Sequence, residues 1–211
     1  MPTAIIDFET TGLSPAQGDR ATEIAIVLME GDREVGRFQS LMNAGVYINS
    51  FIESYTGISN DMIANAPPAE EVMAEAARFV GDAPMVAHNA SFDRRFWAAE
   101  LARLGPDAGA PGAGNPFACT LLLSRRLYPE AGSFKLGSLA ALHALSFSSR
   151  AHRAMADAEV AALLWAKIRR DMARRYEVDD APHDLLVKVG GVPKGKMPQT
   201  IRSYLDSLAA A

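Results

Sequence analysis

The segment from Ile5 to Gly12 (IIDFETTG) constrains the fold more than any other part of the chain. Apolar residues lead up to Asp7 and Glu9, and Thr-Thr-Gly then ends the pattern. Residues two apart in a β-strand point to the same face, so the segment predicts a buried strand with two carboxylates side by side at its end. Such a pair is costly to desolvate unless a cation neutralises it. Because hard oxygen ligands suit Mg²⁺ or Mn²⁺, the pair predicts a metal site.

The composition sets broad limits on the class of protein. With 211 residues, 49% hydrophobic and 22% charged, the chain has enough apolar material for the core of a globular domain. The net charge of −4 argues against a protein that coats nucleic acid through charge alone. It does not exclude an enzyme that acts on nucleic acid, because metal-binding acids themselves lower the net charge.

Two basic clusters near the C-terminus are expected to be solvated surface, with a track for backbone phosphates as the alternative. They consist of Arg169, Arg170, Arg174 and Arg175, and of Lys188, Lys194, Lys196 and Arg202. The single cysteine, Cys119, cannot form an internal disulfide, which fits a reducing compartment. The start of the chain does not resemble a secretory signal, and no apolar run approaches the ~20 residues that span a bilayer. We therefore expect a cytoplasmic protein without membrane contact.

The apolar patterns predict strands first, followed by helices and strands in alternation. Beyond the first strand, strands are expected at 22–30, 35–43, 85–88 and 117–120. Helices are expected as short pieces within 49–64, at 67–80, 91–104, 120–127 and 135–144, and from about 155 onward. Val160, Leu163, Leu164 and Ile168 lie at helical spacing in the last of these. The Gly/Pro-rich stretch 105–116 reads as a loop.

This order predicts a mixed α/β domain over residues 1–176, built on a five-stranded sheet flanked by helices. Short connections favour an antiparallel meander for the first three strands, which the later strands join in parallel. Residues 177–211 are expected to form an extension of unknown role. Within it, 190–198 reads as irregular and 200–208 as a short helix.

Two further segments offer ligands to a metal. Asp93 lies in the first turn of the predicted helix 91–104, where an acid is also common because it complements the helix dipole. Asp157 interrupts an Ala-rich helix start, and His152 precedes it by five residues, so both can face one cleft. Taken singly, each of these residues has an ordinary structural explanation. In combination with Asp7 and Glu9, they form a specific pattern.

This pattern resembles the DEDDh family of 3′→5′ exonucleases, and within it the proofreading epsilon subunits of bacterial DNA polymerase III. The resemblance covers roughly residues 2–170 and implies a ribonuclease H-like fold. The motifs that carry it are Asp7-Phe8-Glu9-Thr10-Thr11-Gly12, His88-Asn89-Ala90-Ser91-Phe92-Asp93 and His152-Arg153-Ala154-Met155-Ala156-Asp157-Ala158.

The resemblance implies two divalent cations, Mg²⁺ or Mn²⁺, about 4 Å apart, which activate water and stabilise the departing 3′ oxygen. Asp7 would bridge both cations, Glu9 and Asp157 would hold the first, and Asp93 would support the second. His152 would be the general base, since a histidine can accept a proton near neutral pH.

The same resemblance implies that the turn after the acids meets the 3′-terminal nucleotide. The candidate substrate contacts are Thr10, Thr11, Gly12, Leu13, Asn89 and Phe92. A pocket of this kind admits one strand end, so single-stranded or mispaired 3′ termini are the expected substrates. Tyr55-Thr56 departs from the His that family members often carry before Gly-Ile, which leaves the contacts to the terminal base open.

Thr10 stands where the oligoribonuclease branch usually has Met, which favours DNA over RNA, with RNA trimming as the alternative. The resemblance allows an association with a DNA polymerase, although residues 177–211 do not resemble a polymerase-binding extension. Oligomeric state is not predicted.

Two readings outside the exonucleases are disfavoured. A haloacid-dehalogenase-like phosphatase would carry Asp rather than Glu9 and would give no role to the His152–Asp157 motif. A non-catalytic ribonuclease H-like binding subunit would be expected to lack one of the five positions, yet all are filled.

Overall fold

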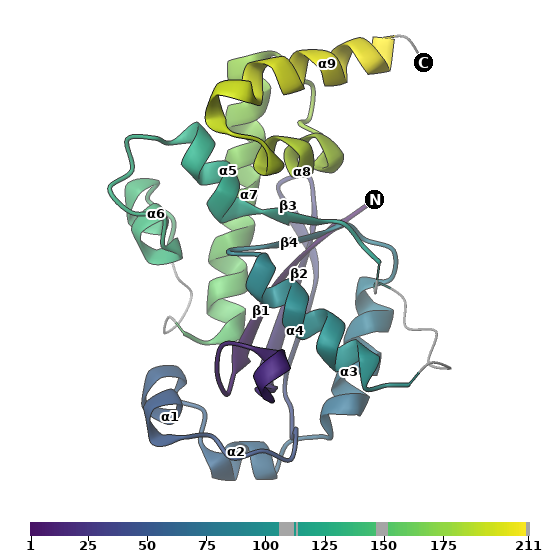
Figure 1. Ribbon diagram of the computed structural model, residues 1–211, viewed down its shortest axis with the longest axis vertical. Coiled ribbons are helices and arrows are strands. Elements are labelled where there is room, and N and C mark those ends of the chain that lie inside the picture. The colour runs from purple at the N-terminus through teal and green to yellow at the C-terminus, as the bar shows by residue number, and fades with distance from the viewer. Residues whose placement is uncertain (106–111, 113, 147–151, 210–211) are drawn as a thin grey trace.

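The computed structural model describes residues 1–105, 112, 114–146 and 152–209 (Figure 1). Its centre is a five-stranded sheet in the order β3-β2-β1-β4-β5. The strands are β1 (Thr3–Thr10), β2 (Ala21–Glu30), β3 (Arg33–Leu41), β4 (Met85–Ala87) and β5 (Phe117–Cys119). The first three pair antiparallel, and β4 and β5 join β1 in parallel. The predicted mixed α/β sheet is confirmed.

The helices lie close to their predicted positions, except for α8, which was not predicted. They are α1 (Ser50–Thr56), α2 (Asn60–Ala64), α3 (Ala69–Val80), α4 (Ser91–Ala102), α5 (Thr120–Leu127), α6 (Leu136–Leu142), α7 (Ala154–Tyr176), α8 (His183–Gly191) and α9 (Met197–Ala209). None of the helices in these described ranges is both long and apolar enough to cross a bilayer. Most of the predicted loop at 105–116 lies outside the described residues.

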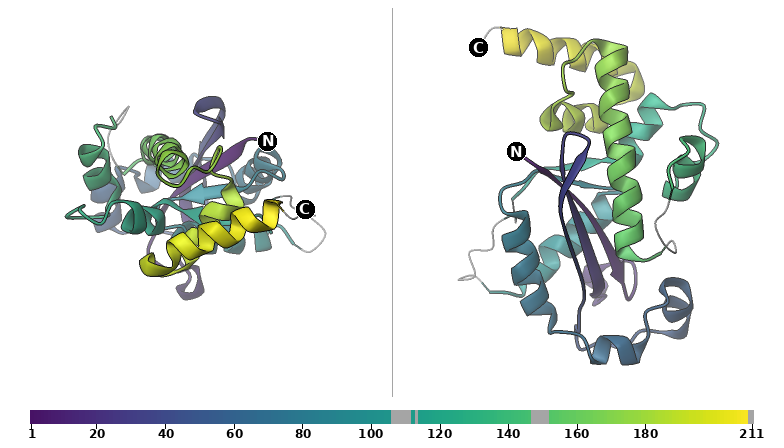
Figure 2. Two further views of the ribbon diagram at one scale, coloured as in Figure 1. Left: turned by 90° about the horizontal axis from the view of Figure 1, so that it is seen from above. Right: turned by 180° about the vertical axis from the view of Figure 1, so that it is seen from behind.

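Strand β1 is covered on both faces, which explains its continuous apolar sequence. Ile5 belongs to a core formed with α5, α7 and α8, whereas Ile6 belongs to a second core formed with α3 and α4. Helix α7 therefore lies along one face of the sheet, and α3 and α4 lie along the other (Figure 1 and Figure 2). By strand alternation, Asp7 and Glu9 share the face of Ile5 and point toward α7.

Three details differ from the predictions. Strand β3 begins at Arg33 rather than at residue 35, because Gly31 at φ +63° permits a two-residue turn and Glu30 pairs directly with Arg33. In α7, Leu163 is 43% exposed, while the rest of the predicted apolar stripe is buried. The prediction of an irregular segment at 190–198 was wrong in part, because α8 continues to Gly191 and α9 begins at Met197.

Packing explains the order in this C-terminal part. Leu185, Leu186 and Val189 are fully buried in the same core as Ile5, and this burial outweighs the low helix propensity of glycine in α8. Helix α9 lies at the opposite end of the molecule from α1 and α2 (Figure 1). The division of the chain at residue 176 stays a prediction.

The first basic cluster is largely engaged in ion pairs on the surface. Arg169 pairs with Asp180 and Arg170 with Asp32, and Arg174 lies 3.2 Å from Asp171. These pairs agree with the interpretation of the cluster as helix surface.

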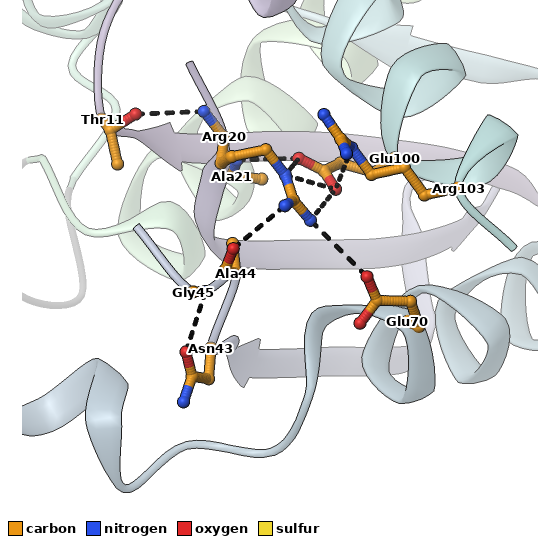
Figure 3. A network of polar contacts seen from close by, with 9 residues as sticks. All are labelled: Thr11, Arg20, Ala21, Asn43, Ala44, Gly45, Glu70, Glu100 and Arg103. Atoms are coloured by element: carbon orange, nitrogen blue, oxygen red, sulfur yellow. Dashed lines mark hydrogen bonds and ion pairs between the residues drawn. The ribbon is translucent and has the colours of Figure 1, made fainter. Parts of the chain in front are cut away.

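A buried ion pair joins α4 to the beginning of β2. Figure 3 shows the Arg20 guanidinium facing the Glu100 carboxylate, with Nε and Nη2 each 2.9 Å from a carboxylate oxygen. The side chains are 9% and 2% exposed. Nη1 of Arg20 also donates to the Ala44 carbonyl, and the backbone amide of Arg20 donates to Oγ1 of Thr11. One buried arginine thus connects α4, β2 and the turn that follows β1.

We expect Glu100→Gln to lower the free energy of unfolding by about 3–5 kcal/mol, because it removes the buried counter-charge of the Arg20 guanidinium, for which the exposed Glu70 compensates little. Urea unfolding measures this loss. The matched control is Glu70→Gln, since Glu70 is 52% exposed and lies 3.8 Å from the same guanidinium. Its removal should cost no more than about 1 kcal/mol. Equal losses of stability in the two variants would contradict the assignment of Glu100 as the main counter-charge of Arg20.

Candidate active site

Three carboxylates from two elements converge at the end of β1. Asp7 and Glu9 project from β1, and Asp157 projects from the first turn of α7. One oxygen from each lies within 4.8 Å of the others. Glu9 is 8% exposed, and Asp7 and Asp157 are half-buried. Carboxylates at this spacing form a ligand set for a hard cation.

Asp93 approaches the same place from α4. It lies in the first turn of that helix and is 2% exposed. Among the described residues it falls outside the tight group of three, but its charge raises the pKa of Asp7. The backbone amides of Asp93 itself and Phe8 favour its ionised form. The four predicted acids therefore surround one end of β1.

The electrostatics of the site favour the binding of cations. Burial is the main cause that raises the pKa of Asp7, and the charges of Asp93 and Asp157 raise it further. Burial, followed by the charge of Asp157, raises the pKa of Glu9 to about 8. Burial likewise raises the pKa of Asp93 to about 8 and the pKa of Asp157 above its ordinary value. Four acids that resist ionisation together, with oxygen ligands only, fit a site for divalent cations.

His152 lies beside Asp157 in a strained backbone conformation. Its φ is +63°, in the left-handed region that is uncommon for residues other than glycine. Its backbone N–H donates to Oδ2 of Asp157 at 3.3 Å. The imidazole packs against the ring of Tyr55, with 4.1 Å between centroids. The backbone turn and the ring contact together hold the imidazole beside the acids.

A cavity of about 580 Å³ opens next to the acids, between α1, α6 and the beginning of α7. His152 and Asp157 line it together, as the spacing of these two residues predicted. Asn89, at φ +68°, also lines it. Phe92 does not: its ring packs on Phe96, 4.9 Å away, within the core shared by α3 and α4. The structure thus brings Asn89 to the cavity and packs the half-buried Phe92 against the core.

The turn after the acids is fixed by local contacts. Oγ1 of Thr10 donates to the carbonyl of Gly12 at 2.6 Å. A Cβ at Gly12 would lie 2.4–2.5 Å from the Asp19 carboxyl group, so the close approach of Asp19 requires glycine here. Asp19 in turn accepts the amide of Ser14 at 2.8 Å. Leu13, between these contacts, is 77% exposed and free to meet a ligand.

Glu23 is a site residue that the sequence reasoning missed. It stands opposite Glu9 in the β1–β2 register and is 1% exposed. Its carboxylate lies 2.8 Å from Arg153 and accepts the amide of Ala154 at 3.1 Å. Glu23 thus anchors the start of α7 next to His152. A glutamate inside an apolar strand was the available signal, because a buried charge requires a partner.

Comparisons with known proteins agree with this geometry. The RNase_T family model, described as an exonuclease, matches residues 4–165. The chain is 32% identical over 193 residues to a PolC-type DNA polymerase III of Bacillus cereus, covering 91% of this chain and 13% of that protein. It is 38% identical over 167 residues to the 3′-5′ exonuclease DinG of Bacillus subtilis, covering 78% of this chain and 17% of that protein. The chain thus spans less than a fifth of either relative.

Two solved structures share the fold. A structure of exonuclease X in complex with 5′ overhanging duplex DNA aligns with a TM-score of 0.64 and 25% identity, covering 94% of this chain and 98% of that one. E. coli exonuclease I in complex with a dT13 oligonucleotide aligns with a TM-score of 0.70 and 20% identity, covering 83% and 42%. The ribonuclease H-like fold expected from the motifs is confirmed.

The acid cluster should make the metal-free protein less stable as pH rises. The pKa values of Glu9 and Asp93 are about 8 in the folded protein and ordinary when it unfolds, so the native state binds more protons between about pH 5 and 8. Urea unfolding in EDTA from pH 5 to 9 should show a falling free energy of unfolding. Glu9→Gln should reduce that slope and stabilise the metal-free protein at pH 8 by roughly 1–3 kcal/mol.

The matched control for Glu9→Gln is Glu23→Gln. It should destabilise the protein, because it removes the partner of Arg153 and the acceptor for the Ala154 amide. If Glu9→Gln does not stabilise the protein, the charges at Glu9 do not repel as described, and a stabilising Glu23→Gln would contradict the anchoring role of Glu23.

Proposed function

The chain belongs to the exonuclease family described by the RNase_T model, and on that premise we propose that it removes nucleotides from the 3′ end of a nucleic acid strand by metal-dependent hydrolysis. The observation that carries the proposal is the convergence of Asp7, Glu9 and Asp157, with oxygens within 4.8 Å of one another, beside His152. Phosphodiester cleavage needs a hard cation site, a proton acceptor and room for a strand end, and this arrangement supplies all three.

In this proposal Asp7, Glu9, Asp93 and Asp157 hold two divalent cations, Mg²⁺ or Mn²⁺. When bound, the cations polarise the scissile phosphodiester and make water more acidic. The acids come from rigid elements, since Asp7 and Glu9 lie on the central strand and the other two lie in first turns of helices. Such a scaffold fixes the spacing of the ligands before any cation binds.

His152 acts as the general base that accepts the proton of the attacking water. Its imidazole lines the cavity together with Asp157, and its own backbone amide holds the Asp157 carboxylate. The ring of Tyr55 restricts the imidazole from one side. His152 therefore couples the position of the base, its own imidazole, to that of the metal ligand Asp157.

The substrate is a single strand end, and we favour DNA. The turn from Thr10 to Leu13 leads directly from the acids and presents an exposed apolar side chain to a terminal base. DNA occupies the related structures of exonuclease X and exonuclease I. RNA is the second candidate, since a structure of a 3′-exonuclease with a histone mRNA stem-loop also shares the fold, at 18% identity and a TM-score of 0.65.

The similarity to PolC-type DNA polymerase III supports a role for this exonuclease in association with a DNA polymerase, in replication or repair. The single cysteine and a nucleic acid substrate support a cytoplasmic location. Residues 178–204 pack into the core that holds α7 in place, so we propose that the C-terminal part stabilises the exonuclease fold.

A 5′-labelled single-stranded DNA should be shortened stepwise from its 3′ end with Mg²⁺ or Mn²⁺, and EDTA should stop the reaction. Asp7→Asn should reduce the rate at least about 10³-fold, because it removes a charged ligand from the centre of the site. The control is Asp82→Asn, an exposed acid in the turn before β4, which should leave the rate unchanged. A matched RNA oligonucleotide should react more slowly. Full activity of Asp7→Asn would refute the metal assignment.

His152→Ala should lower kcat by roughly 10²–10⁴-fold, the range that general base catalysis contributes. Mn²⁺ affinity, measured by titration calorimetry, should stay close to that of the unaltered protein, because the imidazole is not one of the proposed ligands. An unchanged kcat would exclude His152 as the base, and a large loss of Mn²⁺ affinity would assign it to the metal site instead.

A further inference from the structure

Three aromatic rings form a row that leads from the acids to the surface along α1. The imidazole of His152 lies 4.1 Å from the ring of Tyr55, centroid to centroid. The ring of Tyr55 lies 6.1 Å from that of Phe51, and the two planes are within 11° of parallel. Exposure rises outward along the row, from 47% for Tyr55 to 71% for Phe51. The row is continuous with the cavity, since Tyr55 and His152 both line it.

Helix stability does not account for this arrangement. An aromatic pair at i and i+4 stabilises a helix by only about 0.2–0.5 kcal/mol. The polar contacts of α1 already fix its ends, since Asn49 caps its first turn through the amide of Ile52 and Glu53 accepts the amide of Asn60. A mostly exposed phenylalanine next to a second exposed aromatic ring therefore points to a ligand with flat apolar faces.

The opposite wall of the cavity has a different character. Lys135, at the start of α6, lines it together with Gly137 and Ser138. Lys135 is an exposed residue, and within the described ranges its ammonium has no carboxylate partner. By contrast, the nearby cation Arg153 is paired with Glu23. The cavity thus has one aromatic wall and one wall with an unpaired positive charge.

We propose that Phe51 and Tyr55 stack against the bases next to the 3′-terminal nucleotide, while Lys135 contacts a backbone phosphate of the same strand. This inference rests on the proposed function and adds the orientation of the strand, with bases toward α1 and backbone toward α6. Aromatic rings bind bases of any sequence because every base has a π-face. An unpaired lysine provides the point charge that a phosphate requires. A single-stranded nucleic acid has both features at once.

The test is binding rather than hydrolysis, so it does not depend on turnover. The full-length Asp7→Asn protein is titrated into single-stranded DNA that carries 2-aminopurine one or two positions from its 3′ end. Stacking should quench the fluorescence of 2-aminopurine. Phe51→Leu and Tyr55→Leu should each weaken binding between about 5-fold and 100-fold, the range for one base on one aromatic side chain, and should relieve the quenching. Tyr55→Phe should preserve both signals.

The matched control is Tyr47→Leu, because Tyr47 is 77% exposed but does not belong to the row. It should leave binding and quenching unchanged. An oligonucleotide with abasic sites in place of the two bases should bind about equally to the parent protein and to Phe51→Leu. Lys135→Gln should weaken binding, reduce the slope of log affinity against log salt by about 0.7, and leave the quenching of the bound probe intact.

The outcomes separate the two proposals. Leucine variants that bind like Tyr47→Leu would overturn the stacking row, even in a protein that degrades DNA. Quenching that depends on Phe51 and Tyr55 would support the row, even in a protein without exonuclease activity. Absence of oligonucleotide binding would overturn both. Thermal unfolding of each variant shows whether α1 is intact, and Tyr55→Phe keeps the test decisive if Tyr55→Leu unfolds.

Discussion

The gathering of four acids, two buried and two half-buried, at the end of one strand is the constraint on which the rest of this structure depends. Asp7, Glu9, Asp93 and Asp157 meet at the end of β1, where burial raises the pKa values of all four and neighbouring carboxylates raise those of Asp7 and Glu9 further. No arrangement of this kind is favourable by itself in a protein interior. The fold must hold the acids together until cations neutralise them, and its other polar contacts serve that requirement.

The elements that carry the acids are fastened by charges of opposite sign. Glu100 on α4 binds Arg20 at the start of β2, and Glu23 on β2 binds Arg153 at the start of α7. Asp93 and Asp157 also lie in first turns, where the helix dipole offsets part of their repulsion. The same residues position the cavity and the turn after the acids, because Arg153 adjoins His152 and the backbone amide of Arg20 donates to Thr11. Metal site and strand entrance are thus parts of one framework.

Periodicity and turn chemistry predicted most of the fold. The apolar run of β1, the Gly31 turn and the acid-rich start of α3 are local signals, and the structure confirms the elements they predicted. The errors occurred where packing outweighs local preference. Gly190 and Gly191 predicted irregular chain, yet the burial of Leu185, Leu186 and Val189 keeps α8 helical. The substrate contact expected of Phe92 stays a prediction, since its half-buried ring packs on Phe96 at the edge of the core.

The sequence by itself determined which acids could meet, because strand and helix periods fix the direction of each side chain along its own element. The sequence also places Gly12 directly after the acids. Only the structure shows that the close approach of the Asp19 carboxyl group is the reason for a glycine there. The tertiary structure alone decided which distant residues become neighbours, such as Arg20 and Glu100, 80 positions apart, or Glu23 and Arg153, 130 apart. The physical reason is that such distances arise from the packing of whole elements, which no local spacing encodes. The contact between Tyr55 and His152 has the same origin, whereas Phe51 and Tyr55 become neighbours through the helical spacing within α1.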